Sequence, residues 1–162
     1  MNLFVTAKSP VKCAINLDDK RLVKAVLETA QLLSTALGVG YKPSFTAHPV
    51  TLWVCASKLH QVWTRAHLVA LCEEYTFRFN KRHACQDLLS QFKIETSLPA
   101  TFTDIVFQNS ARNLALGLDY THLPVPQSYK AYLLAKWKAA GAKGVRWTNR
   151  EFPSWFKPKA SE

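Results

Sequence analysis

The sequence lacks a long apolar segment and a basic leader. Its uninterrupted apolar runs fall well short of the roughly 18 residues that a membrane-spanning helix needs, and the N-terminal stretch MNLFVTAKSP has no cluster of positive charge before its short apolar patch. Hydrophobic residues make up 48% of the 162 residues and charged residues 20%, which is typical of a globular chain. We therefore expect one cytoplasmic domain over residues 1–162, without a membrane partner.

Paired cysteine motifs are absent as well. The four cysteines are Cys13, Cys55, Cys72 and Cys85, and no two of them form a C-x-x-C pair. This spacing argues against a zinc ribbon and against a redox motif. His83 lies two residues before Cys85, but two potential ligands do not make a metal site. We expect reduced thiols, no disulfide, no metal and no cofactor.

Carboxylates are scarce relative to cations. Lys and Arg total 21 against 11 Asp and Glu, which gives a formal net charge of +10 and a pI near 9.6. An excess of this size on a small domain indicates a polyanionic partner. From charge alone, nucleic acid or a nucleotide is the expected ligand; the sequence does not indicate an oligomeric state.

Hydrophobic periodicity predicts an all-α fold, a compact single-domain helical bundle with an irregular N-terminal lead-in and C-terminal tail. The pattern predicts helices at residues 16–37, 49–79 (one long helix, or two with a bend), 84–93 and 127–140. Asn16 is expected to cap the first helix and Gly38 to end it. Residues 95–128 are expected to be mostly irregular, with a short helix near 110–117, and the tail from residue 143 carries no regular pattern.

Glu28 is the only carboxylate between Asp19 and Glu73, and it lies away from the apolar arc of the first predicted helix. One interpretation is a solvated acid paired with Lys24, an interaction worth a few tenths of a kcal/mol. Spacing alone favours this interpretation. The other is a functional acid in a basic groove beside Arg21 and Lys24, which would keep it ionised. A carboxylate so placed could stabilise the oxocarbenium-like state of a glycosyl transfer or hydrolysis.

Further candidate nucleic-acid contacts lie on the second helix and in the C-terminal segment. Arg65 is a candidate phosphate contact, whereas Trp53 and Trp63 are expected in the core. The C-terminal candidates are Lys136, Arg146, Trp147, Arg150 and Trp155. Interleaved aromatics and cations suit base stacking and phosphate neutralisation. Alternatively, the tryptophans pin the tail to the helical core and leave the cations in solvent.

The blocks DDKRLVKAVLETAQLL, HPVTLWVCASKLHQVWTRAHLVALCEEY and YKAYLLAKW occur in an order that resembles the phage pyrimidine-dimer DNA glycosylase family of the endonuclease V type. The resemblance is closest to small phage members without established activity. It implies a helical domain that grips damaged duplex DNA, kinks it and flips a base out. It also implies that the N-terminal α-amine attacks the sugar C1′ to form an imine, assisted by one glutamate and no metal. Glu28 falls on the position of that glutamate, and Arg21 on a DNA-proximal position usually held by histidine.

The resemblance therefore implies a DNA N-glycosylase with abasic-site lyase activity on a damaged or modified pyrimidine, in the bacterial cytoplasm if the gene is carried by a phage. Asn2 is too large for efficient removal of the initiator methionine, so the candidate nucleophile is the amine of Met1. The alternative is a non-catalytic phage protein that binds or sequesters DNA or a small nucleotide in the same basic cleft, because TAQLL stands where the family has arginines after its glutamate. A structural basic protein without a defined ligand is the third hypothesis.

Overall fold

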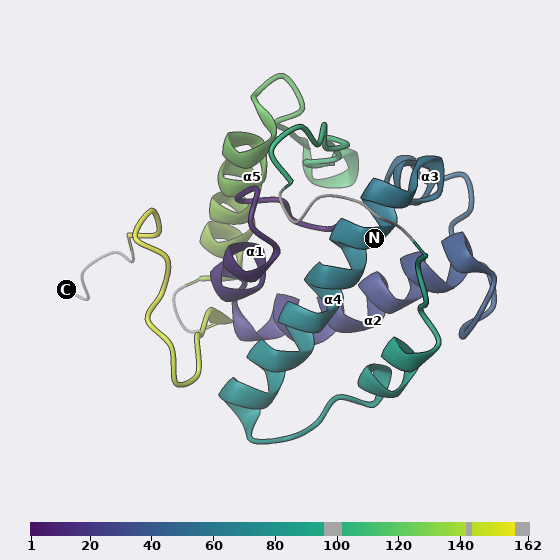
Figure 1. Ribbon diagram of the computed structural model, residues 1–162. Helices are drawn as coiled ribbons and strands as arrows, with labels where there is room; N and C mark the ends of the chain where they lie inside the picture. Colours follow the sequence, from purple (N-terminus) through teal and green to yellow (C-terminus); the bar gives the residue numbers. More distant parts are fainter. Residues whose placement is uncertain (96–101, 142–143, 158–162) are drawn as a thin grey trace.

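The computed structural model describes residues 1–95, 102–141 and 144–157 (Figure 1). The helices are α1 (Pro10–Asn16), α2 (Asp19–Leu37), α3 (Pro49–Ala56), α4 (Lys58–Phe79) and α5 (Val125–Ala140), with short 3₁₀ helices η1 (Ala84–Ser90) and η2 (Leu114–Leu116). The strands are β1 (Arg112–Asn113) and β2 (Leu118–Asp119), which form a two-residue antiparallel ladder. The prediction of an all-α fold is confirmed, because helices supply nearly all the regular structure of the described residues.

The first long helix begins at Asp19, so the prediction that Asn16 caps it is wrong. Asn16 is instead the last residue of α1, a separate short helix that Ser9 caps by accepting from the Lys12 amide at 3.3 Å. The chain is extended at Leu17 and Asp18 before α2 starts. Arg78 of α4 stabilises this break, since its guanidinium donates to the carbonyls of Ile15 and Leu17 at 3.0 and 2.8 Å.

The second predicted helix is divided into α3 and α4, which was one of the two expected alternatives. Ser57 lies between them in an extended conformation, and its hydroxyl accepts from the His60 amide at 3.1 Å, which caps α4. The two helices therefore leave Ser57 in different directions, and α3 packs beside α2 near the N-terminus of the chain (Figure 1).

The structure refines three other sequence predictions. The short helix expected near residues 110–117 is the three-residue 3₁₀ helix η2, which lies in a hairpin between β1 and β2 and ends at Gly117 with a left-handed φ of 65°. The shorter helix expected at 84–93 is a 3₁₀ helix that ends at Ser90. The last helix starts at Val125 rather than residue 127, because prolines suit the first turn of a helix and Pro126 lies in that turn.

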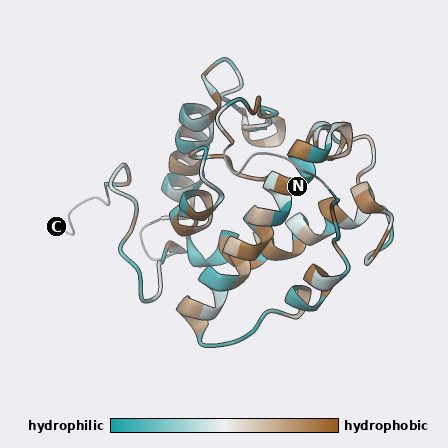
Figure 2. Cartoon of the chain, viewed as in Figure 1, coloured by the Kyte–Doolittle hydropathy of each residue, from teal (hydrophilic) through white to brown (hydrophobic). Residues whose placement is uncertain are grey.

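The core is centred where α2 and α4 cross (Figure 1). Apolar residues gather along this crossing (Figure 2), and Leu22, Leu33, Leu68 and Leu71 are fully buried there. A second buried cluster joins the N-terminal residues to α3, α4 and α5. None of the helices in the described ranges combines the length and apolarity that crossing a bilayer would require.

The C-terminal tail is anchored to this core although it has no regular helix. Trp155 stacks on Trp137 of α5 at 5.2 Å between ring centroids, and Trp147 meets the same ring edge-on at 5.0 Å. Arg150 donates to both carboxylate oxygens of the buried Glu74 of α4, at 3.0 and 2.6 Å. The tail therefore packs against α4, α5 and the junction between α1 and α2.

Candidate active site

The N-terminus of the chain is buried beside the start of α3 and the hairpin. Leu3 and Val5 are 3% and 1% exposed, and Asn2 donates its side-chain amide to the Ser110 carbonyl at 2.9 Å. The Met1 side chain is only 1% exposed, and the Thr51 hydroxyl lies 3.7 Å from its sulfur. Because its side chain is held in the core, the position of the Met1 α-amine is fixed.

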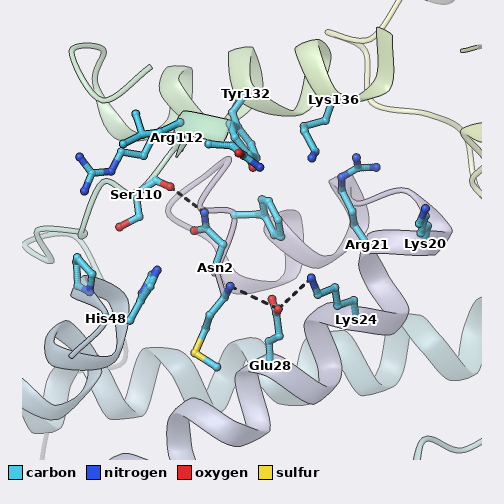
Figure 3. Close-up of a pocket in the computed structure, with 15 residues that line it drawn as sticks. Asn2, Lys20, Arg21, Lys24, Glu28, His48, Ser110, Arg112, Tyr132 and Lys136 are labelled. Atoms are coloured by element: carbon cyan, nitrogen blue, oxygen red, sulfur yellow. Dashed lines mark hydrogen bonds and ion pairs between the residues drawn. The ribbon is translucent and has the colours of Figure 1, made fainter. Parts of the chain in front are cut away.

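The Met1 amine lies next to Glu28. Its nitrogen is 3.5 Å from Glu28 Oε1, and Lys24 Nζ approaches the same oxygen at 3.3 Å (Figure 3). The Glu28 side chain is 12% exposed, whereas that of Lys24 is 71% exposed. Glu28 thus makes the ion pair with Lys24 that the spacing predicts, but it is not a solvated surface acid. One carboxylate and two primary amines meet at one point.

These groups line a cavity of about 550 Å³ enclosed by α2, the start of α3, the hairpin and α5 (Figure 3). The side-chain cations on its wall are Lys20, Arg21, Lys24, Arg112 and Lys136, and Glu28 is the one carboxylate among its lining residues. A concave surface with this charge distribution attracts anions and concentrates them near the amine. The cavity therefore suits a phosphate-bearing ligand.

Arg21 is held at the cavity by a buried carboxylate. Asp18, which is 0% exposed, accepts from the Arg21 guanidinium at 2.9 and 3.0 Å and from the Trp137 indole N–H at 2.8 Å. The indole of α5 thus fixes the carboxylate, and the carboxylate fixes the arginine. This arrangement orients one cation of the cavity before any ligand binds.

Aromatic rings form a further part of the wall. Phe4 and Tyr132 both line the cavity, with their centroids 6.3 Å apart and an interplanar angle of 31°. The backbone of Phe4 has a φ of 48°, a left-handed conformation that bulky residues rarely adopt and that costs on the order of 1–3 kcal/mol. Strained residues of this kind cluster at functional sites, and the two tilted rings place aromatic carbon beside the cations.

His48 is a cavity residue that sequence reasoning did not select as functional. It precedes α3, and its Nδ1 accepts from the Val50 amide at 3.2 Å. Burial, followed by the positive charge of the N-terminal amine, lowers the pKa of His48, and Glu28 acts in the opposite direction. The only sequence signal was its position before Pro49, which indicates a helix cap and not a role at a site.

Several predicted contacts lie outside the cavity. Arg65 donates to the carbonyls of Phe92 and Leu89 at 2.8 and 3.2 Å, so its guanidinium ties α4 to the segment around η1. The structure does not bring it to Glu28. Its local role is to hold two chain segments together.

The C-terminal candidates also differ in whether they line the cavity. Of the five C-terminal candidates, only Lys136 lines the cavity. Trp147 and Trp155 pack on Trp137, and Arg150 pairs with Glu74 and lies over the Phe77 ring at 4.3 Å. Arg146 is exposed to solvent and does not line the cavity. Trp147, Trp155 and Arg150 thus have packing partners within the protein, and their role as nucleic-acid contacts stays a prediction.

Metal ligands do not gather at the site. In the part of the chain that the structure describes, no three His, Cys, Asp or Glu side chains are grouped so that they could hold a metal ion. The thiols of Cys13, Cys72 and Cys85 are buried, and that of Cys55 is exposed. The reactive groups that line the cavity are the Met1 amine, the Glu28 carboxylate and the surrounding cations.

The fold and the cavity define a helical protein with an amine–carboxylate pair in a basic pocket. The residues that line the pocket come from positions 1–49 and 110–136. Residues 1–87 match the pyrimidine dimer DNA glycosylase family, so the chain belongs to this family. The matched range includes Met1, Arg21, Lys24, Glu28 and His48, while Arg112 and Lys136 lie beyond it. Neither the curated proteins nor the solved structures include a significant match to the chain.

Proposed function

We propose that the protein is a DNA N-glycosylase with abasic-site lyase activity that acts on a damaged or modified pyrimidine in duplex DNA. The observation that carries the proposal is the distance of 3.5 Å between the Met1 α-amine and Glu28 in a cavity lined by cations. Membership of the pyrimidine dimer DNA glycosylase family supports the same reaction.

The first step breaks the glycosidic bond. The Met1 nitrogen bonds to C1′ of the target nucleotide, while the bond from C1′ to the base nitrogen breaks with its electron pair on the base. Glu28 Oε1 is close enough to accept the proton that the amine must lose. An ionised Glu28 also stabilises the oxocarbenium character that develops at C1′ as the base departs.

The second step opens the sugar and cleaves the strand. As the bond between C1′ and O4′ breaks, Glu28 can return its proton to O4′, which leaves a protonated imine between C1′ and the Met1 nitrogen. Removal of a C2′ proton, again by the Glu28 carboxylate, expels the 3′-phosphate oxygen with the electron pair of its bond to C3′. No electron acceptor is needed, because elimination and imine formation are redox-neutral.

The cations of the cavity supply binding to DNA. Arg21, Lys24, Arg112 and Lys136 line opposite walls of the cavity, so phosphates on either side of a flipped nucleotide can be neutralised together (Figure 3). Binding of this type weakens steeply as salt rises, since neutralised phosphates release counterions.

Borohydride trapping tests the proposal. Protein with its native N-terminus is incubated with duplexes that carry an abasic site or ultraviolet photodimers, in the presence of borohydride. We expect a covalent adduct whose yield falls by about 100-fold or more in Glu28→Gln. The yield should be retained in Lys24→Arg and in Glu73→Gln, a control on the exposed face of α4. Absence of adduct, base release and strand cleavage in the unsubstituted protein would contradict the proposal.

The size of the cavity favours a second candidate, a protein that binds or sequesters a small nucleotide without chemistry. A volume of about 550 Å³ lies within the range of small-molecule sites, which is roughly 300–1,000 Å³. Heat denaturation of the purified protein, followed by mass spectrometry of the supernatant, tests it. Recovery of an unchanged nucleotide together with failure of imine trapping would favour this candidate.

A further inference from the structure

His48 has two ring nitrogens in different situations. Nδ1 accepts from the Val50 amide at 3.2 Å and thereby caps α3. The half-buried ring also lines the cavity that contains Met1 and Glu28 (Figure 3). No residue in the described ranges forms a hydrogen bond with Nε2.

The cap determines which nitrogen carries the proton. Because Nδ1 accepts a hydrogen bond, the proton of a neutral imidazole is on Nε2, which is then a donor and not a base. Burial and the charges of the Met1 amine and Arg112 lower the pKa of His48 and favour this neutral form. The neutral His48 ring therefore adds an N–H donor without charge to the cations that line the cavity.

We propose that His48 is a catalytic residue whose Nε2–H donates a hydrogen bond to a carbonyl oxygen of the departing pyrimidine. This inference rests on the proposed glycosylase function. It assigns a protein group to the departing base, which neither Met1 nor Glu28 contacts in the first step as proposed. Those two residues act on the sugar, whereas the negative charge that develops on the base needs a donor on the opposite side of the breaking bond.

The electron balance of the step defines the role. The electron pair of the bond between C1′ and the base nitrogen moves onto the base, where it is delocalised to the carbonyl oxygen. His48 keeps its proton and stabilises this oxygen by hydrogen bonding, and water later protonates the released base. A neutral donor suits this task because it attracts a phosphate less strongly than the surrounding cations do and so stays available to the base.

His83 offers a matched control. It also caps a helix through Nδ1, which accepts from the Cys85 amide at 3.1 Å, and burial also lowers its pKa. It lies against Tyr75 and does not line the cavity. Asparagine is a favoured capping residue, so His48→Asn and His83→Asn both preserve the cap while removing the imidazole.

The experiment compares two reactions of each variant under single-turnover conditions. The first is base release from duplexes containing a thymine photodimer, 5-hydroxymethyluracil or 5-formyluracil. The second is borohydride trapping on a preformed abasic site, where no base departs. We expect His48→Asn to slow base release by about 100-fold and to change trapping by no more than about twofold, with both reactions unchanged in His83→Asn.

The outcomes separate this inference from the proposed function. Base release by His48→Asn at the unsubstituted rate overturns the inference alone, as does an equal loss of release and trapping, which would indicate misplacement of the amine. Trapping without release of any of these bases by the unsubstituted protein removes the glycosylase step and the inference with it. Absence of both reactions overturns the proposed function itself.

Discussion

Substitution of Glu74 by glutamine tests how the tail and the helices are held together. Glu74 is 4% exposed and accepts from Arg78 at 2.7 Å and from Arg150 at 3.0 and 2.6 Å. Arg78 is 1% exposed and also donates to Asp19 at the start of α2, at 3.0 Å. One carboxylate therefore links α4, the tail and the helix that carries Glu28.

The magnitude follows from what remains after the substitution. Loss of one partner of a buried ion pair typically costs 3–5 kcal/mol, because the other charge is left buried. Arg78 would keep Asp19 and two carbonyl acceptors, while the Arg150 side chain, 28% exposed, can be solvated. We therefore expect the lower end of that range, about 3 kcal/mol, or a fall in Tm of roughly 6–12 °C for a domain of this size.

Urea unfolding monitored by near-ultraviolet circular dichroism measures this cost, since the stacked tryptophans of the tail report on its packing. Glu73→Gln, at the adjacent exposed position, should change the free energy of unfolding by less than about 0.5 kcal/mol. A loss below about 1 kcal/mol in Glu74→Gln, or equal losses in both variants, would refute the reasoning that the buried carboxylate organises the tail.

Two further predictions concern buried polar groups. Asp18→Asn should weaken binding to duplex DNA, because Arg21 is released. It should also cost about 1–3 kcal/mol of stability, because it disturbs the hydrogen-bond acceptor of Trp137. Anisotropy titration and urea unfolding compare it with the exposed control Asp104→Asn, and an unchanged affinity for DNA would contradict the prediction. Burial lowers the pKa of His67 to about 4 in the native protein, whereas the unfolded chain binds this proton near pH 6.5. Stability should therefore be full above pH 6.5 and fall progressively toward about pH 4, and a flat profile, or the same slope in His67→Leu, would contradict this.

Local patterns were sufficient for much of the fold. Helical periodicity and caps predicted most of α2, α4 and α5, and the tryptophans of the second predicted helix are buried as expected. The break at Leu17 could not be predicted, because the carbonyls there are satisfied by Arg78, 61 residues away in sequence. Likewise, the hairpin at residues 112–119 is anchored by tertiary contacts that periodicity does not encode.

The same division applies to the site. Arg21, Lys24 and Glu28 share one face of a single helix, so spacing was enough to group them. Met1 joins them only because its side chain is buried and Asn2 is bonded to Ser110, a contact across 108 positions. Composition could not show which tail residues reach the cavity, since a tryptophan that stacks on Trp137 has the same sequence pattern as one that stacks on a base.

The most direct test of the account is to locate the trapped adduct. After borohydride reduction on abasic duplex DNA, the protein is digested with nuclease and trypsin, and the N-terminal peptide Met1–Lys8 is fragmented by mass spectrometry. The account predicts a deoxyribose remnant on the α-nitrogen of Met1, at a yield that collapses in Glu28→Gln. A remnant on Lys24, or no remnant on any amine, would contradict the central claim that Met1 and Glu28 form the reactive pair.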